Sequence, residues 1–435
     1  MKRSITAAWA GALVLAALAG AGLRARDGRG APPPVPPSAP MADLALREAD
    51  IALFQQRAAE DPSSAGDRAR LAYLYLQRAR ETGDYQDFRR AETEARASVQ
   101  RRSTHNSSGR LALASSLLAQ HRFAEARAAA EELVKHDPDK PSYRALLAEI
   151  QMELGDYEAA EASFGMLDAH RGDLAVAPRL ARWLEMRGQT SPALELLMRS
   201  RDVAVARTDL PREQVAWFFL RVGDLELRNG RLNQAEQAFR GGLAVEPGDA
   251  RLYMAMARVE AARGRPARAL QWAGAVEARA DLATLALMGD AHRALGDSAS
   301  AERYFARLER EHDANPEPFA RQWTQFRLDH GRQPAATLAV LRAESAARPD
   351  PLGFDMLGWA LYLSGDVSGA RAASRRALAS GVRDATFEYH AGMISRAAGD
   401  RAAARRHLTA ALDINPHFHP VHAAEARTAL RELGN

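Results

Sequence analysis

The sequence contains no cysteine. This absence excludes disulfide bonds, thiolate metal sites, a cysteine nucleophile and a lipid-modified N-terminal cysteine. Lysine is almost missing, because the chain has only Lys2, Lys135 and Lys140, and none of the three follows a glycine-rich phosphate loop. A serine nucleophile elbow and the paired-histidine helix motif of zinc hydrolases are also absent. We therefore predict that the protein is not an enzyme and needs no cofactor.

Aromatic residues are scarce, at 6% of the chain, whereas apolar residues make up 47% and alanine supplies many of them. Alanine is the strongest helix former, so this composition favours an all-α fold of closely packed helices. The 59 basic residues only slightly outnumber the 55 acidic ones. The arginines are interleaved with acidic residues and form no basic run, so we predict no nucleic-acid binding.

The N-terminus has the order of a secretory signal. Lys2 and Arg3 precede an apolar run from Ile5 to Leu23 that ends in small residues, and a cut after Ala21 fits the small-residue rule. We therefore expect residues 1–21 to be a signal peptide and the protein to be exported, either periplasmic or secreted. The alternative is an uncleaved anchor in the inner membrane, because about 19 apolar residues can just span a bilayer.

The C-terminal part of the chain contains the same unit twice in a row. Gly358 and Ala370 of the first copy correspond to Gly392 and Ala404 of the second, at an offset of 34 residues. Each copy has two amphipathic segments joined by a Gly-Asp turn, which predicts an antiparallel helix pair. Such a pair cannot bury its apolar face alone, so we expect the copies to stack into a solenoid.

An alanine opens the second helix of each predicted pair, and it recurs along most of the chain at nearly constant steps. These alanines are Ala91, Ala126, Ala160, Ala193, Ala235, Ala269, Ala301, Ala336, Ala370 and Ala404. The step from 193 to 235 is longer than the others, and Pro211 within it resembles a helix start. The predicted organisation is a proline-rich linker (22–40), an N-terminal block (41–200), a longer connection (201–214), a C-terminal block (215–417) and a capping helix (418–435).

One good copy of the unit has a large residue, a pair that corresponds to Leu-Gly, an alanine, a second large residue and a proline in a fixed order. These residues are Phe219, Val222, Gly223, Ala235, Phe239 and Pro247. In this pattern the chain resembles the tetratricopeptide repeat family from roughly Asp67 to Pro416. The resemblance implies a right-handed superhelix whose first helices line a concave groove that binds peptides or partner proteins.

The resemblance also indicates which side chains face that groove. They are Trp217, Leu220, Asp224, Asp355, Trp359, Tyr362, Tyr389, Met393 and Arg396. Exposed aromatic residues with an arginine are typical of binding hot spots, so we predict that a protein or peptide partner binds here. The alternative is that Trp359 and Tyr389 pack between neighbouring first helices. The Lys and Asn residues with which some members of the family hold a C-terminal carboxylate are missing at these positions.

Three histidines, His417, His419 and His422, are close together near the C-terminus, with His407 one helix earlier. Imidazoles at this spacing are able to share a metal ion if a fourth ligand is present. The alternative is a polar connection into the capping helix.

The repeats, the groove residues and the export signal together predict a non-catalytic scaffold of the cell envelope. The histidines favour the alternative, which is an accessory metal-handling or enzyme-maturation protein.

Overall fold

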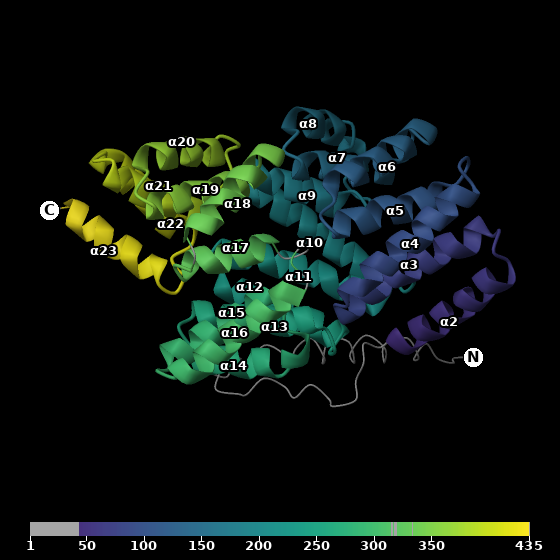
Figure 1. Ribbon diagram of the computed structural model, residues 1–435, viewed down its shortest axis with the longest axis horizontal. Coiled ribbons are helices and arrows are strands. Elements are labelled where there is room, and N and C mark those ends of the chain that lie inside the picture. Colours follow the sequence, from purple (N-terminus) through teal and green to yellow (C-terminus); the bar gives the residue numbers. More distant parts are fainter. Residues whose placement is uncertain (1–42, 315, 317–319, 333, 435) are drawn as a thin grey trace, which may run out of the picture. The chain divides into compact units, whose positions relative to one another are not determined.

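The computed structural model describes residues 43–434 except 315, 317–319 and 333 (Figure 1). The predicted signal peptide or anchor (1–21) and the predicted linker (22–40) lie outside these residues. The described part of the chain consists of α-helices and two short 3₁₀ helices and has no strand, which confirms the predicted all-α fold. None of the described helices has the length and apolar character that crossing a membrane requires.

The helices pack as successive pairs that stack on one another, as expected for a solenoid. The pairs are α3 (Ala65–Thr82) with α4 (Tyr85–Arg101), α5 (Ser107–Ala119) with α6 (Phe123–His136), α7 (Pro141–Glu153) with α8 (Tyr157–Gly165), α9 (Ala177–Met186) with α10 (Thr190–Ala206), α11 (Arg212–Arg228) with α12 (Leu232–Val245), α13 (Ala250–Ala262) with α14 (Pro266–Gly274), α15 (Leu282–Ala294) with α16 (Ser298–Ala314), α17 (Ala320–Asp329) with α18 (Pro334–Ala347), α19 (Pro351–Leu363) with α20 (Val367–Leu378), and α21 (Ala385–Ala397) with α22 (Arg401–Ile414). The single helices α2 (Leu44–Glu60) and α23 (His422–Gly434) flank them, and the 3₁₀ helices are η1 (Asp168–His170) and η2 (Glu277–Arg279).

The Gly-Asp turns join the two helices of a pair through two separate effects. Gly365 has a φ of +87°, a backbone conformation that glycine adopts without steric cost and that ends the first helix. The Asp366 carboxylate then accepts a hydrogen bond of 2.8 Å from the backbone N–H of Gly369 and caps the second helix. The turn at Gly399–Asp400 repeats this arrangement.

The recurring alanines lie where the helices of a pair come closest. All ten predicted alanines are buried except Ala336, which is exposed because Thr337 occupies the buried position in that pair. Glycines of the first helices serve the same contact, since a Cβ atom on Gly223 would overlap the ring of Phe239. The small residues of the sequence pattern are therefore explained by close helix packing.

The predicted longer connection at 201–214 is wrong. Helix α10 continues to Ala206 and α11 begins at Arg212, so only residues 207–211 connect them. Both helices have 17 residues. No glycine or proline interrupts residues 201–206, so the α10 helix continues through the segment that was expected to be a connection.

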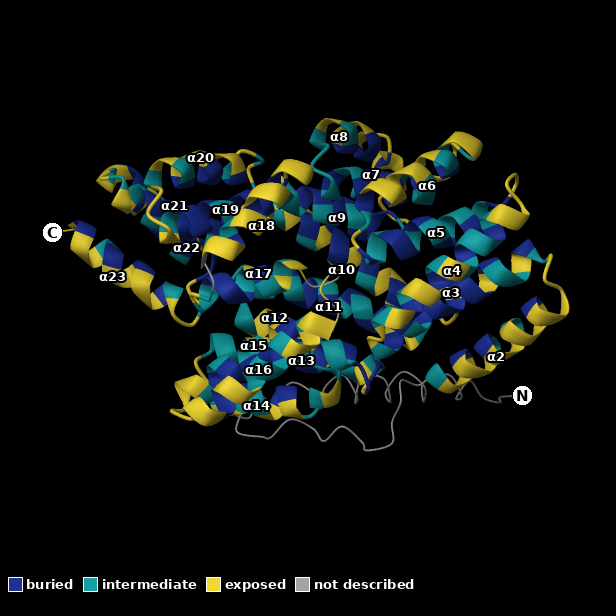
Figure 2. Cartoon of the chain, viewed as in Figure 1, coloured by how far each residue is buried: buried dark blue, intermediate teal, exposed yellow. Residues whose placement is uncertain are grey.

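The two terminal helices each have one buried and one exposed side (Figure 2). In α23, which lies within the predicted capping segment 418–435, the buried residues Ala423, Ala426, Ala429 and Leu433 recur at helical spacing. Helix α23 packs against α22 through this side, and its opposite side is exposed. A helix that ends a stack of repeats is expected to have one buried side and one exposed side.

Three turns also contact loops that lie almost two hundred residues later in the chain. A Cβ atom on Gly155 would be 2.8 Å from the carbonyl oxygen of Pro349, and one on Gly188 would overlap the carbonyl oxygen of Gly381. At the third turn, Asn415 donates a hydrogen bond of 3.1 Å to the carbonyl oxygen of Leu227. We call these contacts the seam. Helices α18 to α20 thereby lie close to α7 to α9 (Figure 1).

Candidate functional site

Equivalent positions of successive first helices carry charged side chains along most of the stack. These residues are Glu149, Arg182, Asp224, Arg258 and Asp290. We call the side of the first helices that they mark the inner face, because the repeat pattern predicts the groove there. The inner face is polar in the middle of the chain and becomes aromatic towards its C-terminal end.

Charged pairs connect one first helix to the next across the inner face. The pairs are Glu149 with Arg179 at 2.7 Å, Glu185 with Arg228 at 2.6 Å, Asp224 with Arg258 at 2.8 Å and Asp290 with His330 at 2.9 Å. Ion pairs that are partly exposed contribute little to stability. The pairs therefore set the charge pattern of the inner face more than they hold the repeats together.

Three arginines gather between α9 and α11 and share few acidic partners. Glu185 lies 2.6 Å from Arg228 and 3.5 Å from Arg182, whereas Arg221 makes no ion pair or hydrogen bond within the described residues. Burial lowers the pKa of Arg221, and the neighbouring charge of Arg228 adds to this effect. Burial also disfavours the charged form of Arg182. The nearby charges of Glu185 and Glu153 outweigh this effect of burial and raise the pKa of Arg182.

We call Arg182, Arg221 and Arg228 the arginine cluster. Sequence reasoning did not single out Arg221, because nothing in the repeat pattern shows which arginines make no ion pair. A desolvated guanidinium without a partner favours the approach of an anion, and the side chains of Arg182 and Arg228 are each 39% exposed. The cluster is therefore the part of the inner face best suited to an acidic ligand.

The predicted groove residues in the middle of the chain lie beside the arginine cluster on α11. Trp217 is half-buried and packs edge-on against Phe218, with ring centroids 5.1 Å apart. Leu220 is buried, and Asp224 forms an ion pair with Arg258. Trp217 is therefore the predicted aromatic residue of this region that has surface left for a partner.

Three predicted groove residues near the C-terminus are buried, which corrects the expectation that they are exposed. Asp355 is 3% exposed, Trp359 5% and Tyr389 1%. The ring of Trp359 stacks on His390 at 4.1 Å between centroids, and Asp355 lies 2.9 Å from Nδ1 of the same histidine. The structure therefore supports the alternative of packing between neighbouring first helices, α19 and α21.

Helix α23 and the loop before it cover these aromatic side chains. The Tyr389 hydroxyl donates a hydrogen bond of 2.5 Å to Glu425, and the His422 ring stacks on the Tyr389 ring at 4.7 Å. Of the other predicted residues, Tyr362 and Met393 are half-buried, and exposed Arg396 pairs with Glu432 at 2.5 Å. The end of the inner face is thus occupied by the chain itself.

The histidines of the predicted metal site have different neighbours and different structural roles. His417 is exposed, while the rings of His419 and His422 stack at 4.0 Å. Nδ1 of His419 accepts the backbone N–H groups of Val421 and His422, each at 3.2 Å, so it caps the start of α23. His407 lies apart from them, 2.7 Å from Glu388. Across the described residues no group of three or more possible ligands is arranged to hold a metal ion.

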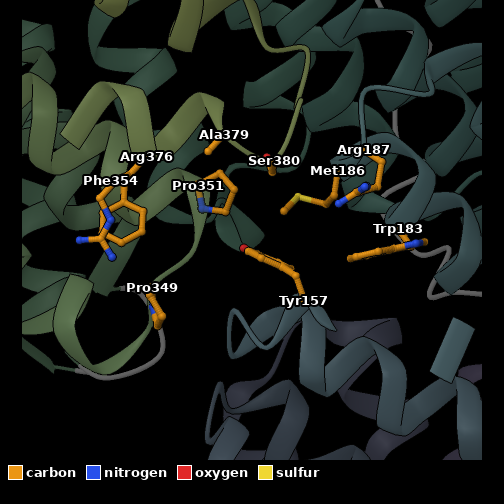
Figure 3. A pocket seen from close by; sticks show the side chains of 10 residues that line it. All are labelled: Tyr157, Trp183, Met186, Arg187, Pro349, Pro351, Phe354, Arg376, Ala379 and Ser380. Carbon is orange, nitrogen blue, oxygen red and sulfur yellow. The ribbon is translucent and has the colours of Figure 1, made fainter. Parts of the chain in front are cut away.

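A small cavity lies at the seam, between helices α8 and α9 on one side and the pair α19 and α20 on the other (Figure 3). Its volume is about 200 Å³, and its lining is mostly aromatic and apolar with two arginines, Arg187 and Arg376. No sequence pattern indicates this cavity, because its two sides come from residues far apart in the chain.

A family model described as "Tetratricopeptide repeat" matches residues 111–173 and 220–283. No curated protein matches the sequence of this chain.

Several solved structures are similar to the fold. PilW, described as a type IV pilus biogenesis factor, is 20% identical, with a TM-score of 0.40, covering 50% of this chain and 98% of its own. PilF of Pseudomonas aeruginosa is 16% identical, with a TM-score of 0.38 and coverages of 50% and 96%. A thermophilic tetratricopeptide repeat protein of Thermus thermophilus is 25% identical, with a TM-score of 0.36 and coverages of 43% and 98%.

The stretches that the family model matches run from α5 to η1 and from α11 to α15. The helix pairs on either side of them have the same glycine turns and, except for exposed Ala336, the same buried alanines. Together, the family match and these recurring helix pairs identify the chain as a tetratricopeptide-repeat protein.

Proposed function

We propose that the protein is a non-catalytic scaffold that binds a protein or peptide partner on the inner face, beside the arginine cluster and Trp217. The observation that carries this proposal is the half-buried guanidinium of Arg221, which makes no ion pair or hydrogen bond within the described residues, and whose pKa burial lowers. An acidic segment of a partner would supply the missing carboxylate, and Trp217 would supply apolar contact area next to it.

The proposal extends to where the protein works. The predicted export signal supports a location in the periplasm or cell envelope, with or without a tether to the inner membrane. Cell fractionation combined with the intact mass of the purified protein tests this. A mature chain that begins at Gly22 in the periplasmic fraction indicates cleavage, a full-length chain in the membrane fraction indicates an anchor, and a chain confined to the cytoplasm refutes export.

Site-specific photo-cross-linking tests the partner site. A photoreactive phenylalanine derivative replaces Trp217, and a matched variant carries it at exposed Gln237 of α12, which lies on a second helix. We expect a discrete cross-linked product in the producing cells at position 217 and none at position 237.

A charge variant then tests the role of the arginine cluster. Arg221→Gln removes the unpaired charge and should weaken the cross-linked product by about tenfold, because a charge-assisted contact contributes that much to affinity. Arg240→Gln on α12 is the control and should leave the product unchanged. Equal cross-linking from positions 217 and 237, or a product insensitive to Arg221→Gln, would refute binding at this site.

A further inference from the structure

Helix α2, which begins the stack of repeats, has a second apolar side that faces solvent. Its buried side, with Ile51 and Ala58, packs against α3. The opposite side carries small and apolar residues at helical spacing, which are Ala45, Leu46, Ala49, Ala52 and Leu53. Leu46 is 70% exposed and Leu53 51%, so this side is open to solvent in the described part of the chain (Figure 2).

The helix at the other end of the stack has a different outer side. The exposed residues of α23 are mostly polar and include Glu425, Arg427, Thr428, Arg431 and Glu432. A stack of repeats needs such polar outer sides at its two ends to stay soluble. Single exposed apolar residues are ordinary, but two leucines seven residues apart with an alanine between them form a stripe suited to packing against another helix. Helix α2 is therefore expected to have a partner.

The chain that precedes α2 does not supply a matching apolar segment. Residues 22–40 are rich in proline and contain only two large apolar residues, Leu23 and Val35. The apolar run before them belongs to the predicted signal peptide or anchor. A second copy of α2, in contrast, carries the same stripe of leucine and alanine and is available wherever the protein is.

Two copies of α2 that run antiparallel match each other in size. A twofold axis near the middle of the 17-residue helix places Leu53 of one copy on Ala49 of the other, and the reverse contact follows by symmetry. Each large side chain then faces a small one, which permits close packing of the two helices.

The ends of the two helices also match in charge. The N-terminus of α2 has no side-chain cap and no acidic residue in its first turn, while Glu60 is exposed at its last turn. In an antiparallel pair Glu60 of each copy lies beside the N-terminus of the other copy. The helix dipole favours a negative charge at that position, so both ends of the pair are stabilised.

We propose that the exposed side of α2 binds a second copy of this chain and forms an antiparallel, twofold-symmetric dimer through Leu46, Ala49 and Leu53. The proposal does not depend on the partner site at the arginine cluster, because none of the residues of that site lies on α2. One helix from each copy makes a small interface, so the dimer is expected to be reversible.

Sedimentation of the purified protein at concentrations from about 1 to 100 µM tests the dimer. We expect a shift from monomer to dimer across this range. Leu46→Glu and Leu53→Glu should each weaken the dimer by at least about tenfold, because the interface would bury a carboxylate without a partner. Leu295→Glu is the control, since Leu295 is also 51% exposed but lies far along the chain. A monomer at every concentration, or equal effects of Leu53→Glu and Leu295→Glu, would overturn the proposal.

Cross-linking tests the antiparallel arrangement, because the chain has no cysteine of its own. Ala49→Cys places a thiol near the twofold axis, so a short bis-maleimide should join two copies. The control Ala59→Cys, also exposed on α2, lies about 25 Å from its counterpart in this arrangement and should give no covalent dimer. Equal yields from the two variants, or a dimer in solution that Ala49→Cys does not cross-link, would refute packing through this side of α2.

Discussion

At the scale of single residues, two turn glycines with the same backbone conformation have different surroundings. Gly188 has a φ of +71° and Gly264 a φ of +70°, so alanine is strained at both positions. A Cβ atom on Gly188 would overlap the carbonyl oxygen of Gly381 across the seam, whereas one on Gly264 would have nothing within 4 Å. The pair therefore separates the cost of the backbone conformation from the cost of opening the seam.

We expect Gly264→Ala to lower the free energy of unfolding by about 1 kcal/mol and Gly188→Ala by roughly 2–4 kcal/mol. Thermal unfolding followed by circular dichroism ranks the two variants, and amide hydrogen exchange should show faster exchange in α9 and α20 for Gly188→Ala only. Equal losses of thermal midpoint would mean that the seam contact does not contribute to stability.

Two tryptophans that the repeat pattern assigns to the same groove also differ. Trp359 is buried, so Trp359→Ala should cost about 3–5 kcal/mol and lower the thermal midpoint strongly. Trp217 is half-buried, so Trp217→Ala should cost only about 1 kcal/mol. Thermal unfolding of both variants checks this order, and a similar midpoint for the two would contradict the burial seen here.

At the scale of an element, helix α23 makes the end of the chain sensitive to acid. Burial lowers the pKa of His422 to about 3, and the neighbouring His419 and His390 contribute further. Its Nδ1 atom is buried without a partner, and its ring lies on Tyr389. Below a pH of about 6.5 the unfolded chain binds a proton at this position while the folded chain does not, so acid favours unfolding.

We therefore expect the stability of α23 to fall as the pH drops from about 6.5 towards 3, by at most about 1.4 kcal/mol per pH unit from His422. His419, whose pKa burial also lowers, acts in the same direction. Asp329 acts in the opposite direction, because burial raises its pKa. Hydrogen exchange of α23 against pH measures the sum of these effects.

His422→Phe isolates the contribution of this one histidine. Phenylalanine keeps a ring on Tyr389 but cannot take up a proton, so the loss of protection in acid should become shallower while protection at pH 7 stays similar. His417→Phe, at an exposed position, should leave the acid response unchanged. An unaltered response in His422→Phe would show that other groups cause the acid sensitivity.

At the scale of the whole molecule, the seam joins pairs of helices that the sequence order keeps far apart. Arg348 donates a hydrogen bond of 2.5 Å to the carbonyl oxygen of Glu153, pairs with the carboxylate of Glu153, and lies 4.3 Å above the ring of Phe123. Arg348 also pairs with Asp350 at 2.9 Å, so several contacts hold its guanidinium at the seam, and we expect the seam to persist in solution.

The absence of cysteine permits a direct test of the closed seam. A variant with Glu153→Cys and Arg348→Cys, treated with a short bis-maleimide, should form an intramolecular cross-link that shifts its mobility in a denaturing gel. The control combines Glu153→Cys with Arg405→Cys on the exposed side of α22 and should give no such product. Equal yields from the two variants would indicate that the seam opens freely.

The sequence by itself determined the parts of this protein that depend on local pattern. Apolar period, Gly-Asp turns and recurring alanines such as Ala370 and Ala404 specify the helix pairs, because the residues involved are close in sequence and each pair repeats the same contacts. The one misplaced connection, 201–214, arose because a longer step between repeats does not reveal whether the extra residues lie in a loop or lengthen the helices.

Only the tertiary structure decided which faces stay open. The pattern assigns Trp217 and Trp359 to the same groove, yet α23 covers Trp359 while Trp217 keeps exposed surface. The seam cavity and the unpaired charge of Arg221 likewise depend on which distant segments meet. Small rotations between successive pairs add up along a stack of repeats, and no local pattern records their sum.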